Sequence, residues 1–312
     1  MWSRKLGHMS LETLRQTKNC VNGLEELSET RFPKNYISSE VKIGKMQHVD
    51  MPKATGTRAS RPMAGIHWDT LGPTTTCSIN GHKYCTIFTC DHSSFTWAYG
   101  HNSTDQIPDI LEKFLADTAV LQEKHGPILW VRRDNASVNV SKKVELILLK
   151  RNIRSETSNP YEPWQNGTSE RMIQTVVGTA RTVMLSSGLV GRFWFHALLY
   201  AVYIHNIQYS GVTKTSPHIL MFDEKPDVSE DQQFGVEGWL YRREDQRKDK
   251  KFDSRCEPCI FLGYPTHQKG YAVWCQERGP NSVVSTSNVT FGNHCLKSKR
   301  PDIEIIQGST NY

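Results

Sequence analysis

Short runs of β-branched and aromatic residues follow one another closely in the first part of the chain's central region. Three such runs, over residues 64–70, 83–90 and 94–99, are separated by turn residues such as Asn80-Gly81. Runs of this length and composition between turn signals are typical of consecutive strands. The pattern therefore predicts an antiparallel start to a sheet.

Helical spacing begins at about residue 105 and continues to about residue 124. Thr104 can cap the start of this helix, and Gly126-Pro127 ends the pattern. Strands and helices then alternate, which is typical of an α/β fold. The further elements predicted are a strand over 128–133, a short helix over 141–151, a strand over 153–157, and helices over 168–187 and 191–207.

Two polar segments interrupt the apolar pattern and divide the chain. Residues 46–63 contain proline and have no apolar period, and residues 223–233 are acidic and polar, so both are expected to be connecting segments. Beyond residue 234, short strand-like runs predict a small all-β barrel. The helix over 191–207 is too apolar for a solvent-facing helix, and packing on the sheet is favoured over a subunit interface.

Composition excludes several classes of protein. The chain has 312 residues, of which 37% are hydrophobic, enough to bury a sizeable core in about two domains. No apolar run approaches the ~18 residues that span a bilayer, and no apolar stretch follows the basic N-terminal residues. We therefore expect neither a membrane nor a secreted protein. The eight scattered cysteines are typical of reduced intracellular thiols.

Positive charge is concentrated in particular segments. The net charge is +6, and residues 1–62 carry 11 lysines and arginines against six acids. A second basic run, residues 242–255, holds seven bases and four acids. Local basic patches on a nearly neutral body suit a polyanion partner, although a soluble surface with ordinary lysines is also consistent with them.

Three acids lie at informative positions. Asp69 is on the first predicted strand, Asp134 directly follows a mid-sheet strand, and Glu170 is in the first turn of a long helix. Carboxylates at such strand positions are costly unless they are paired or bound to metal. Three converging carboxylates fit two hard divalent cations, the arrangement that serves phosphoryl transfer. Each acid alone also fits an ordinary role, as a turn residue or a helix-dipole partner.

The motifs around these acids resemble those of a known family. Thirty-five residues separate Asp134 from Glu170, and the strings HWDTLGP (67–73) and NPYEPWQNG (159–167) flank the first and last acid. Together with the string CIFLGY (259–264), they make the chain similar to the integrase of copia-type LTR retrotransposons. That family belongs with the retroviral-type integrases in the RNase H-like superfamily. The resemblance covers residues 1 to about 292.

The resemblance implies a fold and a domain order. The expected fold is an RNase H-like α/β catalytic core with a mixed five-stranded sheet and flanking helices. The expected divisions are a degenerate pre-integrase zinc-binding-type module (1–45), a linker (46–63), the catalytic core (64–210), a connector (211–233), an SH3-like β domain (234–295) and a tail (296–312).

The resemblance also implies an activity. Asp69, Asp134 and Glu170 would bind two Mg²⁺ or Mn²⁺ ions for 3′-end processing and strand transfer of retrotransposon cDNA into target DNA. The implied partners are DNA and further copies of the chain, and the implied location is nuclear. Candidate DNA-binding residues, for which loop capping or a solvated surface are the alternatives, are Asn135, Gln165, Asn166, Arg171, Arg181, Arg242, Arg243, Lys250 and Lys251.

The sequence departs from the family pattern at the zinc module. Only His8 remains of the four expected ligands, because Ser3, Ser38 and Val41 stand at the other positions. One histidine cannot hold a tetrahedral zinc ion, and small modules of this kind generally need the metal to fold. We therefore expect no zinc and a loosely ordered residues 1–45. Cys20, or a second site around Cys256 and Cys259, remains a weak alternative.

Two competing functions remain open at this stage. The missing zinc ligands, and Ala136 where the family has glycine, favour a catalytically inactive or domesticated nucleic-acid-binding relic. An RNase H-type nuclease is a third interpretation, against which the string QNG (165–167) argues. The chain also lacks the protease and reverse transcriptase of the family's polyprotein, so we expect a fragment of such a polyprotein or a gene made from one.

Overall fold

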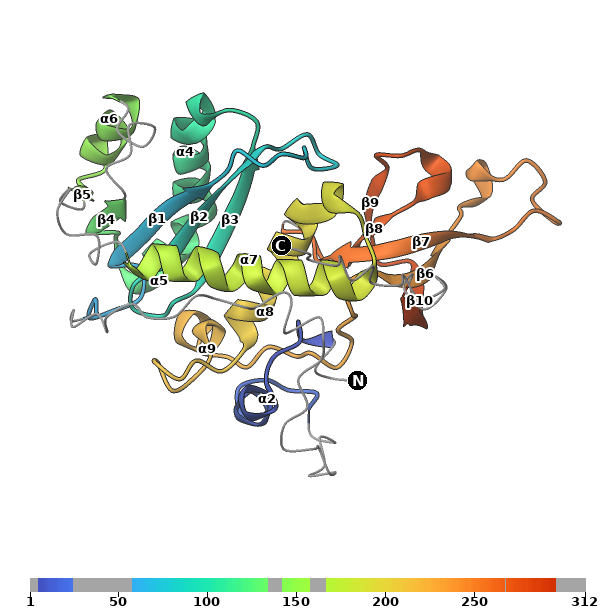
Figure 1. The fold of residues 1–312 in the computed structure, drawn as a ribbon, viewed down its shortest axis with the longest axis horizontal. Coiled ribbons are helices and arrows are strands. Elements are labelled where there is room, and N and C mark those ends of the chain that lie inside the picture. The colour runs from blue at the N-terminus through green and yellow to red at the C-terminus, as the bar shows by residue number, and fades with distance from the viewer. Residues whose placement is uncertain (1–4, 25–57, 134–141, 158–166, 267, 296–312) are drawn as a thin grey trace, which may run out of the picture.

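A mixed five-stranded sheet forms the first half of the fold (Figure 1). Its order is β3-β2-β1-β4-β5; β1 to β3 are antiparallel, and β4 and β5 run parallel to β1. This is the arrangement expected of the RNase H-like core. The strands are β1 (Gly65–Leu71), β2 (Tyr84–Cys90), β3 (Thr96–His101), β4 (Trp130–Arg133) and β5 (Arg154–Thr157). The computed structural model describes residues 5–24, 58–133, 142–157, 167–266 and 268–295.

Helices cover both faces of this sheet because side chains alternate along each strand. On one face, Trp68 and Phe88 join the apolar cluster that buries α4 (Ile107–Asp117) and α6 (Lys142–Lys150). The rings of Phe88 and Phe114 stack there with centroids 4.1 Å apart. On the other face, Ile87 lies in the cluster that buries α7 and α8. Residues of β1 that alternate with Trp68, including Asp69, therefore face the α7 side.

The helix expected over 105–124 is divided into two, and it starts differently. Ser103, rather than Thr104, caps a 3-10 turn (Thr104–Gln106) that leads into α4. The helix then breaks at Thr118, whose hydroxyl donates to the Phe114 carbonyl at 2.7 Å, before α5 (Ala119–His125). Such a hydroxyl competes with the helical hydrogen bonds and bends the helix. The expectation of one continuous helix was wrong.

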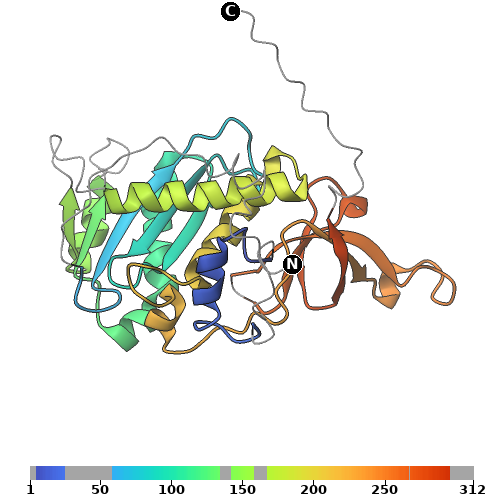
Figure 2. The ribbon, with the colours of Figure 1, turned by 60° about the horizontal axis from the view of Figure 1, so that its bottom comes forward.

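The two long helices α7 (Gly167–Ser187) and α8 (Trp194–Ile207) were correctly predicted. Figure 2 shows the N-terminal half of α7 lying across β1. A 3-10 turn (Gly191–Phe193) precedes α8, which is apolar on nearly all sides and packs against α7, β3 and β7. Burial of residues such as Leu198 and Tyr200 confirms the packing role for α8.

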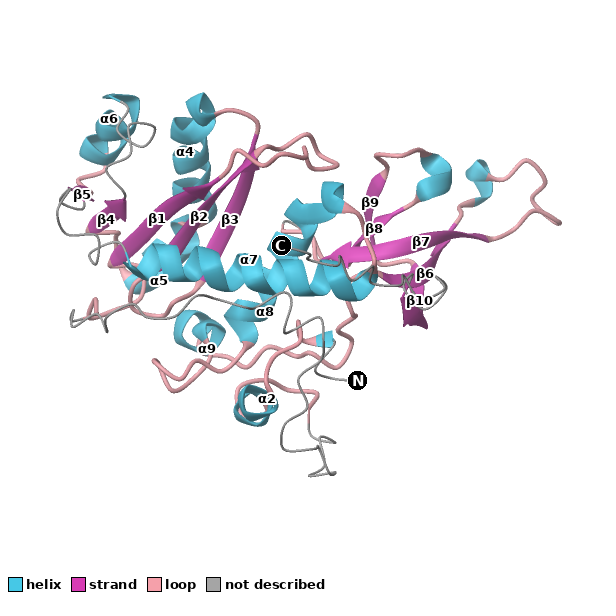
Figure 3. Cartoon of the chain, viewed as in Figure 1, coloured by secondary structure: helices cyan, strands magenta, loops and turns pink. Residues whose placement is uncertain are grey.

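A second, entirely antiparallel sheet follows, as the strand-like runs after residue 234 predicted (Figure 3). Its order is β10-β6-β7-β8-β9, and Leu240, Val273 and Cys275 form its small core. Two 3-10 turns, Glu244–Gln246 and Gln276–Arg278, lie in its loops. The strands are β6 (Val236–Tyr241), β7 (Cys256–Gly263), β8 (Tyr271–Trp274), β9 (Val283–Thr286) and β10 (Val289–Cys295).

The N-terminal segment packs closely on the core. It contains α2 (Leu11–Thr17), which Ser10 caps, and it buries Leu6, Leu14 and Leu24 almost completely. Asn22 pairs through its backbone with the segment that follows α9 (Pro217–Phe222), a short helix that the sequence pattern did not indicate. Residues 5–24 are thus more closely packed than the loose order expected for residues 1–45; residues 1–4 and 25–45 lie outside the described part of the chain.

Among the residues that the structure describes, no helix is both long enough and apolar enough to cross a bilayer.

Candidate functional site

Asp69 lies near the end of β1, on the face of the sheet that α7 covers. It is half-buried, and its Oδ1 accepts a hydrogen bond from the Thr70 backbone N–H at 2.7 Å. Its backbone pairs with Ile87 of β2 in a regular antiparallel register. The strand therefore fixes the position of this carboxylate at a point that is neither deeply buried nor fully exposed.

The parallel register of β1 and β4 relates Asp69 to the second predicted acid. The pairing runs from Gly65 with Trp130 to Trp68 with Arg133, the last described residue of β4. In the sequence, Asp69 directly follows Trp68 and Asp134 directly follows Arg133. The carboxyl ends of parallel strands lie at the same edge of a sheet. Asp134 itself, like Asn135, Gln165 and Asn166, lies outside the described residues.

Glu170 lies in the first turn of α7 and is half-buried. Two residues later, Met172 enters the apolar cluster that holds α7 against Ile87 of β2. Arg171 is exposed, and its Nε donates to the Gly167 carbonyl at 2.7 Å, so part of its hydrogen-bonding capacity is used within its own helix. Arg181 lies farther along α7 with an exposed side chain.

The positions of Asp69 and Glu170 suit metal binding, because their side chains offer carboxylate oxygens. Half-buried carboxylates of Asp69 and Glu170 come from β1 and from the helix that crosses it. Carboxylate oxygens are the ligands that Mg²⁺ and Mn²⁺ prefer. Among the described residues, no three His, Cys, Asp or Glu side chains form a metal-binding group. Asp134 lies outside the described residues, so the three-carboxylate site stays a prediction.

An ion-paired cluster that the sequence analysis missed occupies the same face of the sheet. Arg132 lies opposite Glu156 in the β4–β5 ladder, and its Nη2 is 2.8 Å from Glu156 Oε2. Arg154 reaches the other oxygen of Glu156, also at 2.8 Å. Arg132 also lies opposite His67 in the β1–β4 ladder, and His67 precedes Asp69 by two residues. Two arginines against one glutamate leave local positive charge beside the candidate site.

A buried histidine–aspartate pair secures the start of β1. His67 is 1% exposed, and its Nε2 lies 2.7 Å from Asp91 Oδ1. Burial alone would raise the pKa of Asp91, but the hydrogen bonds with His67 and from the Ala59 N–H, with the charge of Arg58 nearby, lower that pKa overall. The pair fastens the turn after β2 to the strand that carries Asp69.

The guanidinium of Arg133 is buried on the opposite face of the sheet. The side chain is 0% exposed, pairs with Glu145 of α6 and lies 6.0 Å from the Trp68 ring centroid. Burial lowers the pKa of Arg133, although Glu145 acts in the opposite direction. Its Nε and Nη1 make no hydrogen bond to a described residue. This pair anchors the end of β4, immediately before Asp134.

The second basic run is divided by the structure into inward and outward residues. Arg242 reaches Glu277 at 2.7 Å and the buried Glu257 at 3.4 Å. By contrast, Arg243, Lys250 and Lys251 have exposed side chains. Sequence reasoning could not separate Arg242 from its neighbours, because both of its partners lie more than 14 residues away along the chain.

The residues considered for zinc binding lie in two different parts of the fold. His8 and Cys20 are buried in the N-terminal segment. Cys256 is exposed, whereas Cys259 and Cys275 lie in the core of the antiparallel sheet. Burial raises the pKa of Cys259 to about 12 and that of Cys275 to about 11, which disfavours the thiolate that a metal requires. Ser38 and Val41 lie outside the described residues, and the absence of zinc stays a prediction.

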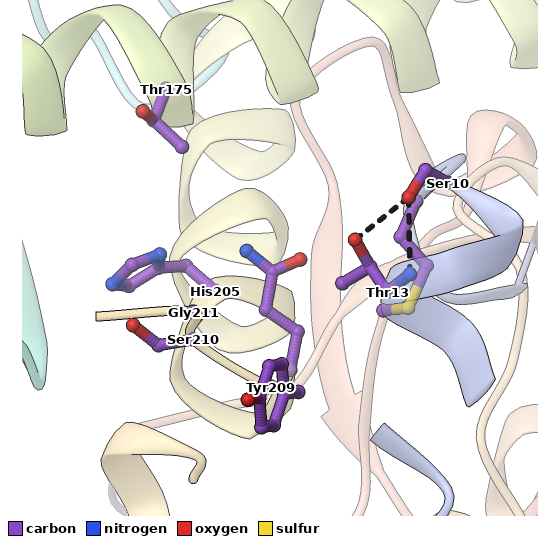
Figure 4. Close-up of a pocket in the computed structure, with 9 residues that line it drawn as sticks. Ser10, Thr13, Thr175, His205, Tyr209, Ser210 and Gly211 are labelled. Atoms are coloured by element: carbon purple, nitrogen blue, oxygen red, sulfur yellow. Dashed lines mark hydrogen bonds between the residues drawn. The ribbon is translucent and has the colours of Figure 1, made fainter. Parts of the chain in front are cut away.

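A cavity of about 360 Å³ lies between the N-terminal segment, α7 and the end of α8 (Figure 4). Thr175, His205 and Tyr209 contribute to its lining, and Ser10 and Thr13 hydrogen-bond each other on its N-terminal side. His205 is held by a 3.0 Å contact from its Nε2 to the Ser94 carbonyl, and burial lowers its pKa. None of the predicted site residues lines this cavity.

The solved structures similar to this chain include two retroviral proteins of low sequence identity. One is the cryoEM structure of the simian T-cell lymphotropic virus intasome in complex with PP2A regulatory subunit B56 gamma: TM-score 0.45, 16% identity, 74% of this chain and 78% of that chain. The other is the HTLV-2 integrase catalytic core domain in complex with magnesium, in a trimeric form: TM-score 0.41, 13% identity, 53% of this chain and 99% of that chain.

Sequence comparisons cover nearly the whole chain. Residues 238–304 match the model of the retroviral polymerase SH3-like domain. The chain is 27% identical over 298 residues to the retrovirus-related Pol polyprotein from transposon TNT 1-94 of Nicotiana tabacum, covering 93% of this chain and 21% of that protein. It is 24% identical over 298 residues to the Pol polyprotein from transposon RE1 of Arabidopsis thaliana, covering 95% of this chain and 19% of that protein. The chain is thus homologous to about one fifth of the retrovirus-related Pol polyproteins of plant transposons.

Proposed function

We propose that this chain is the integrase region of a retrotransposon Pol polyprotein and that it joins element cDNA to target DNA. Residues 64–210 form the catalytic core and residues 234–295 the SH3-like domain, joined by the connector 211–233. Residues 1–45 are the degenerate zinc-type module, with the linker 46–63 after it and the tail 296–312 at the end. In this role the chain binds DNA, associates with further copies of itself and acts in the nucleus.

One observation carries the proposal. The parallel register of β1 and β4 ends on Trp68 and Arg133, and in the sequence Asp69 directly follows Trp68 and Asp134 directly follows Arg133. The helix that begins with Glu170 packs across β1. Two strand-end acids and one acid at a helix start, from three separate elements, are the set that a two-metal phosphoryl-transfer site requires.

The donor set fits the proposed ions. Asp69, Asp134 and Glu170 would hold two Mg²⁺ or Mn²⁺ ions through their carboxylate oxygens. When bound, such ions lower the pKa of an attacking water or hydroxyl and stabilise the leaving oxygen of an in-line displacement. The half-burial of Asp69 and Glu170 suits this role, because it leaves each carboxylate accessible to a DNA phosphate and yet positioned by its own element.

The reaction has two steps of the same kind. In 3′-end processing, a water oxygen attacks a phosphorus near the cDNA end, and the bond from that phosphorus to the 3′ oxygen breaks. The freed 3′ hydroxyl then attacks a phosphorus of the target and displaces another 3′ oxygen. No covalent intermediate with the protein forms. The positive charge of Arg132 and Arg154, reduced by Glu156, supports phosphate binding on the α7 face.

A catalytically inactive nucleic-acid-binding relic is the second candidate. Ser3, Ser38 and Val41 at three expected zinc positions favour it, as does Ala136 directly after Asp134-Asn135. Glycine at such a position permits backbone angles that alanine disfavours. An RNase H-type nuclease stays a third candidate, which substrate choice separates from the first.

A strand-transfer assay tests the proposal. Short blunt DNA duplexes, with and without the element's own terminal sequence, are incubated with the chain and Mg²⁺ or Mn²⁺. The expected result is metal-dependent joining that is lost in Glu170→Gln and kept in Glu123→Gln, an exposed glutamate on α5. Salt-sensitive DNA binding without joining would favour the relic, and cleavage of an RNA–DNA hybrid without joining would favour the nuclease.

A further inference from the structure

The loop between β6 and β7, residues 242–255 and hereafter the β6–β7 loop, projects from the antiparallel sheet away from the mixed sheet (Figure 1). Phe252 lies in this loop and is 88% exposed, the highest value among the large hydrophobic side chains that the structure describes. Lys248, Lys250 and Lys251 precede it and are exposed as well. The loop thus presents one aromatic ring together with three ammonium groups.

The acids of this loop hold its backbone in a defined turn. Asp249 Oδ1 accepts hydrogen bonds from the backbone N–H groups of Lys251 at 2.8 Å and Phe252 at 3.3 Å. Asp253 Oδ2 accepts one from the Asp249 N–H at 2.8 Å, and the Asp253 N–H donates back to the Asp249 carbonyl at 3.1 Å. The two carboxylates therefore fix the backbone at the position that presents Phe252. Their negative charges are not neutralised by these hydrogen bonds.

Two arginines fix the rest of the loop. Arg242 bridges Glu257 and Glu277 at the base. The side chain of Arg247 is 3% exposed and donates to the Lys250 carbonyl at 2.9 Å. These two arginines serve the protein's own structure, so the groups left for a partner are Phe252, the lysines and the exposed Arg243 and Arg255. A fixed backbone also lowers the conformational entropy that binding would otherwise cost.

An exposed aromatic ring beside lysines fits nucleic acid with unstacked bases. Every base has a face on which an aromatic ring can stack, and lysines bind the adjacent phosphates. Paired bases inside a duplex stack on one another and offer no such face, whereas the unpaired bases of a strand end do. Anionic lipid is the competing partner, but a single ring gives little apolar area for insertion.

We propose that the β6–β7 loop binds unpaired nucleotides of DNA, with Phe252 stacked on a base and Lys250 and Lys251 on the flanking phosphates. This inference rests on the proposed function and specifies which part of a DNA end the antiparallel sheet contacts. Stacking and phosphate binding respond differently to salt, because only the latter releases counterions. The two contributions are therefore separable by experiment.

The test measures fluorescence anisotropy of labelled DNA over a series of salt concentrations with the full chain. The DNAs are a single strand, a duplex with a 5′ overhang and a blunt duplex. Phe252→Ala is expected to weaken binding to the first two DNAs about 5- to 100-fold without changing the salt slope, and to affect the blunt duplex less. Phe252→Trp should preserve the affinity. Val120→Ala, a change at another exposed apolar side chain on α5, is the matched control.

The contribution of the lysines is tested through the salt dependence of binding, with its own control. Lys250→Gln with Lys251→Gln should reduce the slope of log Kd against log salt by about 1.4 on the single strand, at ~0.7 per phosphate contact. Lys142→Gln with Lys143→Gln, two exposed lysines of α6, should leave the slope unchanged.

The outcomes distinguish this inference from the proposed function. Equal binding by wild type, Phe252→Ala and Val120→Ala overturns the inference and leaves the integrase proposal standing if strand transfer persists. An equal loss for Phe252→Ala on all three DNAs also overturns stacking on unpaired bases, as does binding to vesicles of phosphatidylserine in preference to DNA. No binding to any DNA by the wild type contradicts the proposed function itself.

Discussion

The hydroxyl of Tyr203, on α8, donates to Asp231 Oδ2 at 2.8 Å, and Asp231 is only 5% exposed. Tyr264, which directly follows β7 of the antiparallel sheet, donates to Asp231 Oδ1 at 3.0 Å and accepts a hydrogen bond from the Gln232 N–H. Tyr200 donates to backbone carbonyls of Lys5 and Gln232. One buried carboxyl thus joins α8, the connector and the antiparallel sheet, next to the N-terminal segment.

This carboxyl makes the stability of the fold depend on pH in a defined direction. Burial raises the pKa of Asp231 to about 6, against the opposing effects of Tyr203, Tyr264 and Lys5. The unfolded chain has a pKa of about 3.9 at this residue, so between pH 4 and 6 the folded state binds more protons. The contribution of Asp231 to stability is therefore greatest below about pH 4 and is lost as the pH rises through about 6.

Asp231→Asn removes this titration. The stability of Asp231→Asn relative to wild type should rise by about 2–3 kcal/mol between pH 4 and pH 7, at ~1.4 kcal/mol per pKa unit. Urea unfolding at several pH values measures the difference. Asp245→Asn, at an exposed position in the β6–β7 loop, is the control. A difference that is independent of pH would contradict the expectation.

Gly65 lies where β1 meets the ring of Trp130. A Cβ added at Gly65 would come within 2.0 Å of the Trp130 ring, whose neighbours are His67 and Arg132. Gly65→Ala should therefore destabilise the fold by about 1–3 kcal/mol, as overpacking does. The penalty should shrink in a Trp130→Val background, because contacting residues are not additive. Thermal unfolding of the four proteins measures this coupling.

The control for Gly65 is Gly211→Ala, because nothing lies within 4 Å of a Cβ at that position. A Gly65→Ala penalty of the same size in both Trp130 backgrounds would show that the ring is not the cause.

The strands and α7 were predictable because their signals are local. β1, β2 and β3 begin and end within two residues of the expected bounds. The break at Thr118 was not predictable, because the apolar spacing of residues 107–121 continues through it. The engagement of Arg242 depends on Glu257 and Glu277, which the sheet brings close and the sequence keeps apart. For the site, the sequence indicated Asp69 and Glu170 but missed the Arg132–Glu156 pair, which only the β4–β5 register makes visible.

The pairing of buried Arg133 with Glu145 predicts an unusual rescue. Glu145→Gln should destabilise the fold by about 1–3 kcal/mol, because it leaves a buried guanidinium without its counter-charge, while the 48% exposure of Glu145 limits the loss. Adding Arg133→Met removes the charge and should recover part of that stability. Denaturant unfolding of wild type, both single variants and the double variant checks the order. A double variant less stable than Glu145→Gln alone would show that the arginine's own packing dominates.

The proposed metal site predicts stabilisation by divalent cations. A ligand that binds only the folded state stabilises it by about 2.7 kcal/mol when present at one hundred times its Kd. The melting temperature of the wild-type chain should therefore rise with added Mg²⁺ or Mn²⁺, and the rise should be lost in Asp69→Asn and in Glu170→Gln. Without added metal, both variants should melt at or slightly above wild type, because each removes one of the converging negative charges. Differential scanning fluorimetry with and without metal measures both effects, and Glu123→Gln should retain the full metal response.

A metal response that survives in Asp69→Asn would place the cations elsewhere in the chain. Loss of the response in Glu170→Gln with retained DNA binding would link the start of α7 to the metal and not to the DNA.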